Sequence, residues 1–138
     1  MNNDLKKLIW LDDIRSPFTN PEWLIFSPID RPYEVIWVKN YNEFVNWITD
    51  NGLPDGICFD HDLSLVQIEC GIALNILPED EKTGYDCANW LVNYCIDHDH
   101  LPIPKFSCQS ANPPGKERIL ALLNNYSVFF VKKNMIYL

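Results

Sequence analysis

The stretch GICFDHDL, residues 56–63, runs from an apolar segment directly into the acids Asp60 and Asp62. An earlier stretch, KLIWLDDIR at residues 7–15, has the same pattern and leads into Asp12 and Asp13. Segments that are apolar at nearly every position predict strands buried on both faces, which is typical of a parallel sheet covered by helices. Acids at the ends of such strands do not stabilise the hydrophobic core, and an unpaired buried carboxylate is costly. Each acid is therefore expected to bind a cation, to cap a helix or to face solvent.

The order of strand and helix patterns predicts the fold class. Five short apolar runs are predicted strands, at residues 7–11, 34–38, 56–59, 105–108 and 127–131. Helical patterns lie between them, beginning at Asn40 and Thr83 and after the Pro-Pro-Gly turn at 113–115. This alternation predicts an α/β fold with a parallel sheet and right-handed crossovers. The proline-rich segment 16–32 is predicted to replace or reduce the first crossover helix, and residues 64–82 to lie over the strand ends as a lid.

Composition limits the possible classes of protein. The 138 residues, 47% of them hydrophobic, predict one domain over residues 1–138. A net charge of -8 argues against extended coating of a nucleic acid, but it permits a small phosphorylated ligand. The five cysteines form no C-x-x-C pair, which argues against a disulfide framework or zinc knuckle. No apolar run approaches the length of a membrane span or a signal peptide, so we expect no membrane partner and a cytoplasmic location.

Chemically active residues are predicted to gather at one edge of the sheet, because parallel α/β sheets bind ligands outside the carboxyl ends of their strands. The first predicted strand supplies Asp12 and Asp13 there, and the third supplies Asp60 and Asp62. The fourth leads into residues 107–110, and the fifth into Lys132 and Lys133. Converging carboxylates repel one another, whereas a hard divalent cation binds them through oxygen. The sequence therefore predicts a site for Mg²⁺ or Mn²⁺.

This arrangement resembles the receiver domain of two-component signalling. The resemblance implies a receiver-like, flavodoxin-like three-layer fold with a five-stranded parallel sheet in the order 2-1-3-4-5. It implies that Asp12 and Asp13 hold the metal together with Asp60, which accepts a phosphoryl group. It further implies that Ser110 and Lys132 contact the phosphoryl oxygens, with Ser107 and Lys133 as alternatives.

A narrower resemblance covers nearly the whole chain. The motifs LDDIR, FDHDL, TGYD and SANPPG, in this order, are similar to the cyclic-phosphate-processing receiver family. That likeness implies a metal-dependent domain that binds, and as a phosphodiesterase or phosphohydrolase processes, a cyclic or terminal phosphate of a nucleotide or RNA end. Asp60, His61, Asp62 and Lys132 are its expected catalytic residues.

The phosphate is expected to bind where SANPPGKERI opens a helix. Ser110, Asn112, Gly115 and Lys116 lie in or next to this turn, where backbone N–H groups and the helix dipole favour an anion. Arg15 follows the acid pair closely enough for its guanidinium to reach a phosphate.

Gln109, also expected at the phosphate site, departs from the pattern of this family, which has histidine there. Glutamine cannot carry a proton near neutral pH, so His61 or Asp62 is predicted to do so. Two other functions stay open at this point. One is a signalling receiver phosphorylated on Asp60, and the other is a protein that sequesters a cyclic nucleotide without cleaving it.

Overall fold

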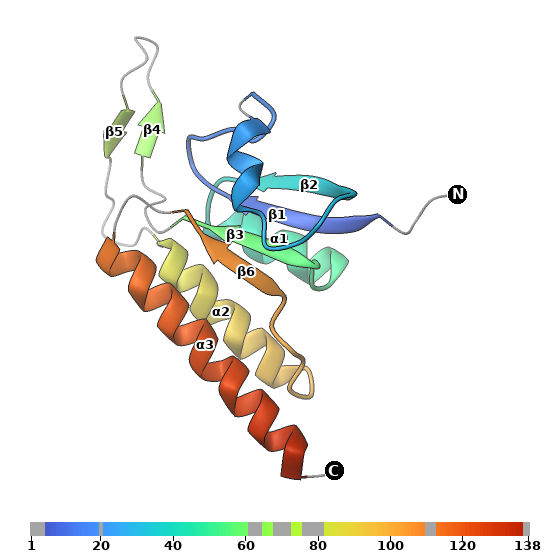
Figure 1. The fold of residues 1–138 in the computed structure, drawn as a ribbon. Coiled ribbons are helices and arrows are strands. Elements are labelled where there is room, and N and C mark those ends of the chain that lie inside the picture. The colour runs from blue at the N-terminus through green and yellow to red at the C-terminus, as the bar shows by residue number, and fades with distance from the viewer. Residues whose placement is uncertain are drawn as a thin grey trace.

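The computed structural model describes residues 5–19, 21–60, 65–67, 73–75, 82–109 and 113–136 of the chain. Along the chain (Figure 1) its elements are β1 (Lys6–Leu11), the 3-10 helix η1 (Pro21–Phe26), β2 (Tyr33–Val38), α1 (Tyr41–Asn51), β3 (Gly56–Phe59), β4 (Leu65–Gln67), β5 (Ala73–Asn75), α2 (Gly84–Asp97), β6 (Lys105–Cys108) and α3 (Pro113–Ile136).

A sheet of four parallel strands in the order β2-β1-β3-β6 forms the centre of the fold. β1 pairs with β2 from Lys6, opposite Tyr33, to Leu11, opposite Val38. All four residues of β3 and the last four of β1 are buried, as expected for apolar strands in the middle of a covered sheet. The predicted α/β class and the predicted order of the first four strands are confirmed.

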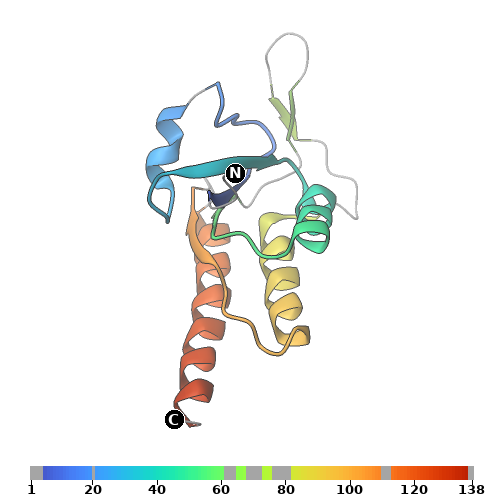
Figure 2. The same ribbon diagram turned by 90° about the vertical axis from the view of Figure 1, so that its right-hand side faces the viewer.

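The two faces of the sheet are covered differently. Residues of α1, α2 and α3 pack on one face in a core that includes Phe44, Leu91 and Leu123 (Figures 1 and 2). Trp10 and Cys58 belong to a smaller core on the other face, against which the η1 residue Trp23 packs. In the described part of the chain, the connection between β1 and β2 thus contains η1 and no α-helix.

Helix starts follow the predicted caps. The Asn40 side chain accepts a hydrogen bond from the Glu43 N–H at 2.8 Å and begins α1. Thr83 and Asp86 form a reciprocal capping box at the start of α2. α1 ends at Gly52, whose φ of 87° lies in the left-handed region that glycine tolerates best.

The fifth predicted strand is wrong, because residues 127–131 lie within α3. Ile119, Leu123 and Tyr126 continue one buried face at spacings of four and three residues, which is helical periodicity. The Tyr126 hydroxyl donates to the Leu101 carbonyl at 2.8 Å, and the Ser127 hydroxyl donates to the Leu123 carbonyl at 2.9 Å. A short apolar run does not distinguish a strand from part of a helix, and here tertiary packing selects the helix.

Val128→Ala tests this correction. Val128 is 53% exposed in α3, and alanine has the higher helix propensity, so we expect the free energy of unfolding to rise by about 0.5 kcal/mol. The measurement is urea denaturation with an unchanged m-value. Val38→Ala is the control, since Val38 is buried in β2 and its truncation should lower stability. A clear loss of stability in Val128→Ala would argue for a strand at this position.

β4 and β5 form a separate antiparallel pair after β3, with Leu65 opposite Asn75 (Figure 1). The lid predicted over residues 64–82 stays a prediction, because most of that segment lies outside the described residues. Within the described residues, no helix has both the length and the apolar character needed to cross a membrane.

Candidate metal and phosphate site

Three acids meet where β1 and β3 end, at the carboxyl edge of the sheet. One carboxylate oxygen from each of Asp12, Asp13 and Asp60 lies within 4.8 Å of the other two. We call these residues the acid cluster. Asp12 is only 1% exposed and Asp60 only 7%, so their charges are held largely away from water. The predicted convergence of these three acids is confirmed.

The two oxygens of Asp12 have different surroundings. Oδ1 accepts hydrogen bonds from the N–H groups of Ile14 at 3.0 Å and Arg15 at 2.9 Å. Oδ2 is buried and accepts no hydrogen bond from the described part of the chain. Arg15 Nη1 lies 3.9 Å from this Oδ2, which is an ion-pair distance but too long for a hydrogen bond. A buried carboxylate oxygen left in this state is costly, so the site suits a bound cation.

The donor set of the acid cluster fits a hard divalent cation. All three side chains offer carboxylate oxygens, which Mg²⁺, Mn²⁺ and Ca²⁺ prefer over nitrogen and sulfur ligands. Cys58 and Cys87 are less suited to this role, since burial raises the pKa of Cys58 to about 11 and also raises that of Cys87. These thiols therefore stay protonated at neutral pH, and the carboxylates are the groups that could hold a metal.

Gln109 links the ends of three strands beside the acid cluster. Its backbone N–H donates to the Phe59 carbonyl at 2.9 Å, and its Nε2 donates to the Leu11 carbonyl at 3.2 Å. Arg15 Nη1 in turn donates to the Gln109 carbonyl at 3.0 Å. Gln109 Oε1 is buried and accepts no hydrogen bond from the described residues. Arg15 and Gln109 thus lie next to the acids, as predicted.

Sequence reasoning missed the end of β2. Trp37 Nε1 donates to the Asp12 carbonyl at 2.8 Å, and the Asp12 N–H donates to the Val38 carbonyl at 3.0 Å. Lys39 Nζ lies 4.4 Å from the centroid of the Trp37 ring. The topology indicates this position, because β2 ends at the same edge as β1 in a parallel sheet.

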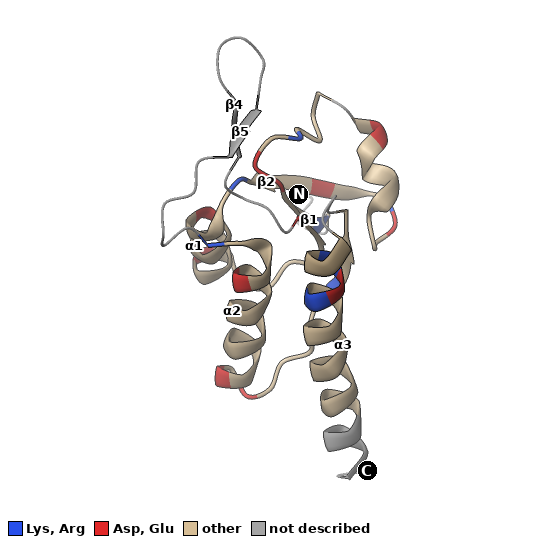
Figure 3. Ribbon diagram, turned by 90° about the vertical axis from the view of Figure 1, so that its left-hand side faces the viewer, with Lys and Arg blue, Asp and Glu red and all other residues tan. Residues whose placement is uncertain are grey.

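Other predicted site residues are placed only in part. His61, Asp62, Ser110 and Asn112 lie outside the described residues. Gly115 is buried in the first turn of α3, and Lys116 is exposed next to it. Figure 3 shows charged residues of both signs at this end of α3, and residues 119–131 carry none.

The predicted delivery of Lys132 by a fifth strand is wrong. Lys132 lies in α3, roughly 28 Å along the axis from Pro113 at about 1.5 Å per residue. The alternative, Lys133, also lies in α3 and not at the end of a strand. The other alternative, Ser107, donates its hydroxyl to the Phe26 carbonyl at 2.6 Å, so it fastens the end of η1 to β6.

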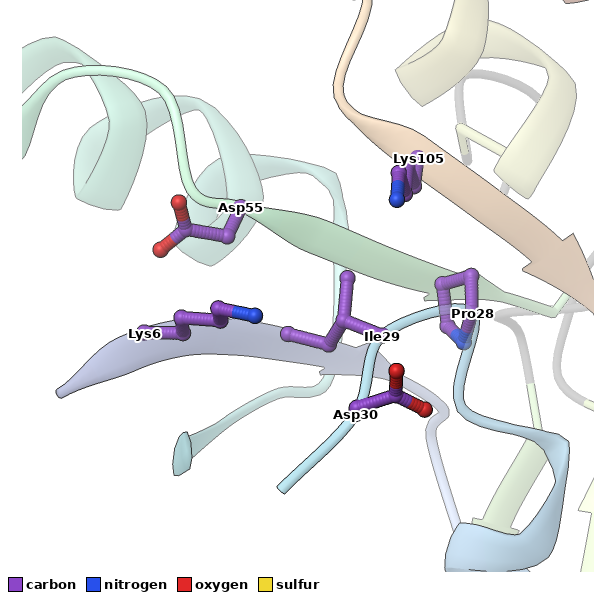
Figure 4. Close-up of a pocket in the computed structure, with 6 residues that line it drawn as sticks. All are labelled: Lys6, Pro28, Ile29, Asp30, Asp55 and Lys105. Atoms are coloured by element: carbon purple, nitrogen blue, oxygen red, sulfur yellow. The ribbon is translucent and has the colours of Figure 1, made fainter. Parts of the chain in front are cut away.

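The described pockets lie away from the acid cluster. One of about 200 Å³ lies at the opposite edge of the sheet and is lined by Lys6, Pro28, Ile29, Asp30, Asp55 and Lys105 (Figure 4). Its two lysines are balanced by two aspartates, and the Asp55 carboxylate already accepts the Lys7 N–H at 2.8 Å. A second, of about 300 Å³, lies at the start of β2 and is lined by Leu24, Arg31, Pro32, Tyr33 and Val35.

Comparison with known proteins identifies a family. The family model described as the cyclic-phosphate processing receiver domain matches residues 7–125, which include all three acids and Gln109. No curated protein and no solved structure matches the chain.

Proposed function

The chain belongs to the cyclic-phosphate processing receiver domain family, and from this premise we propose that it binds a divalent cation and processes a cyclic or terminal phosphate of a nucleotide or RNA end. The observation that carries the proposal is the acid cluster with its buried, unbonded Asp12 Oδ2. Asp12, Asp13 and Asp60 are the proposed ligands of Mg²⁺ or Mn²⁺. When bound, such an ion would neutralise phosphate charge and polarise a phosphoryl oxygen.

The neighbouring side chains support phosphate binding. The guanidinium of Arg15 is held by the Gln109 carbonyl and lies close to Asp12, so its remaining N–H groups are available to an oxyanion. Lys116, exposed in the opening turn of α3, offers a second cation at the positive end of the helix dipole. We propose that these groups, with Ser110 and Asn112, orient the phosphate. Lys132 is not among these groups, because it lies far along α3 from the opening turn.

The proposed reaction is hydrolysis of a cyclic phosphodiester. A water oxygen attacks phosphorus, one P–O bond to the sugar breaks, and the released sugar oxygen takes a proton. One water is consumed, and a phosphate monoester forms. His61 and Asp62 are the proposed proton carriers, because Gln109 has no group that titrates near neutral pH.

Gln109 also favours a second candidate function, which is capture of the cyclic phosphate without cleavage. Its amide is fixed on the Leu11 carbonyl and cannot replace a catalytic histidine. Binding in this case would use the same acid cluster and the same cations.

One experiment separates these functions. The protein is incubated with nucleoside 2′,3′-cyclic phosphates and with oligoribonucleotides ending in a cyclic phosphate, with and without EDTA, and products are separated by chromatography. We expect a phosphate monoester that forms only when a divalent cation is present. Tight binding without product would support capture. A signalling receiver would give a different result. A small phosphodonor would phosphorylate Asp60, as detected by mass spectrometry, and the protein would not bind cyclic phosphates.

A further inference from the structure

We propose that Trp37 and Lys39 form a platform that recognises the nucleobase of the ligand, so that the site takes phosphates that carry a base rather than simple sugar phosphates. This inference rests on the proposed function and deepens it. The two residues lie at the end of β2, beside the acid cluster, and neither belongs to the metal or phosphate groups already described.

The Trp37 ring is tied directly to the acid-bearing loop. Its Nε1 donates to the backbone carbonyl of Asp12 at 2.8 Å, and the strand register places Trp37 opposite Trp10, two residues before Asp12. The side chain is half-buried and packs on the core that contains Trp10, on the face without α-helices. This hydrogen bond therefore holds the indole against the backbone of Asp12, one of the three proposed metal ligands.

Two cations lie over tryptophans close to Asp12. Lys39 Nζ is 4.4 Å from the Trp37 centroid, and the Arg15 guanidinium is 6.0 Å from the Trp23 centroid. In a chain with a net charge of -8, these cations lower the electrostatic cost of bringing an anion to the acid cluster. Lys39 is exposed and can turn its ammonium from the ring to a phosphate, which frees the ring face for stacking.

Cations also lie over aromatic rings elsewhere on this protein. Arg31 lies 6.0 Å from the ring centroid of Tyr33. Tyr33 is on the same face of β2 as Trp37 but at the other end of the strand, roughly 13 Å away at about 3.3 Å per residue. The hydrogen bond from the Trp37 indole to Asp12 distinguishes the proposed platform from that pair. Arg31 and Tyr33 are for this reason the matched controls.

The ligand class follows from this chemistry. An aromatic ring next to a phosphate site stacks on any base and gives little sequence preference. A nucleotide and the terminal nucleotide of an RNA strand both present a base and a cyclic phosphate, and they differ only in the additional phosphates of the strand. Lys39 is placed to interact with such additional phosphates, so the strand should bind with a stronger salt dependence.

The test compares three probes by calorimetry in Mg²⁺: ribose cyclic phosphate without a base, a nucleoside 2′,3′-cyclic phosphate, and an oligoribonucleotide with the same terminal group. We expect wild type to prefer the nucleoside over the base-free probe by roughly 5- to 100-fold. Trp37→Leu should abolish that preference, Trp37→Phe should keep most of it, and Tyr33→Leu should leave it unchanged. Mg²⁺ affinity is measured in each variant to show that the acid cluster is intact.

Lys39→Gln keeps the test open if Trp37→Leu does not fold, because Lys39 is exposed. Lys39→Gln should lower the affinity for the oligoribonucleotide and reduce the dependence of that affinity on salt concentration. Arg31→Gln should change neither quantity. A wild type without base preference, a preference that survives Trp37→Leu, or equal effects of Lys39→Gln and Arg31→Gln would each overturn the platform and leave the proposed function standing. A wild type that binds none of the three probes would overturn both.

Discussion

Replacing Asp13 by alanine is expected to abolish tight Mg²⁺ binding while leaving the fold in place. Asp13 is half-buried at the end of β1 and lies outside both hydrophobic cores, so its removal should cost the core nothing. The variant loses one of three carboxylates that converge within 4.8 Å. Outer-sphere partners of metal ligands are already worth about 10- to 100-fold in affinity, and a direct ligand should exceed that range.

Calorimetry of wild type and Asp13→Ala with Mg²⁺ and Mn²⁺ measures the difference directly. Thermal unfolding gives a second readout, because a ligand that binds only the folded state at 100 times its Kd stabilises it by about 2.7 kcal/mol. That metal-dependent stabilisation should disappear in Asp13→Ala. Asp30→Ala is the matched control, since Asp30 is an exposed aspartate at the opposite edge of the sheet. Equal affinity in wild type and Asp13→Ala would remove the acid cluster as a metal site.

His61→Ala is expected to lower turnover of the cyclic phosphate by about 10² to 10⁴, with ligand affinity within a few-fold of wild type. General acid–base assistance typically accelerates a reaction by this factor, and Gln109 cannot supply such assistance. The amide of Gln109 is already engaged with Leu11, so Gln109→His should change little if His61 carries the proton. Affinity by calorimetry and product by chromatography are measured on the same samples.

Capture without cleavage makes a different prediction for the same two variants. Wild type then binds the cyclic phosphate and releases no product, and Gln109→His is the variant expected to gain slow cleavage. Turnover in wild type that survives the loss of His61 would contradict both versions. The proton-transfer role would then pass to Asp62.

The parts of the fold that sequence predicted well are those with strong local signals. The last four residues of β1 and all four of β3 are apolar, a pattern typical of strands in the middle of a covered sheet. α1 and α2 begin at side chains that cap their own helices, so their starts depend on a few adjacent residues. Residues 127–131 had no such signal, because their helical state depends on contacts of Tyr126 with a distant loop.

The site divides in the same way. The acid cluster could be predicted because parallel strands bring their carboxyl ends to one edge, and topology alone then places Asp12 near Asp60. The hydrogen bonds that fix Trp37 and Gln109 beside it could not be predicted in this way. Their placement depends on side-chain hydrogen bonds to the carbonyls of Asp12 and Leu11, and no sequence pattern records these bonds.

The turn at Asp12 has a consequence for the thermodynamics of metal capture. Because Oδ1 is fixed by two N–H groups of its own loop, the rotamer of this carboxylate is selected during folding rather than when an ion arrives. Ordering a mobile acidic side chain costs conformational entropy at the moment of binding, and this acid has already lost that freedom. At Asp12, ion binding should therefore be opposed mainly by dehydration of the cation and little by ordering of this side chain.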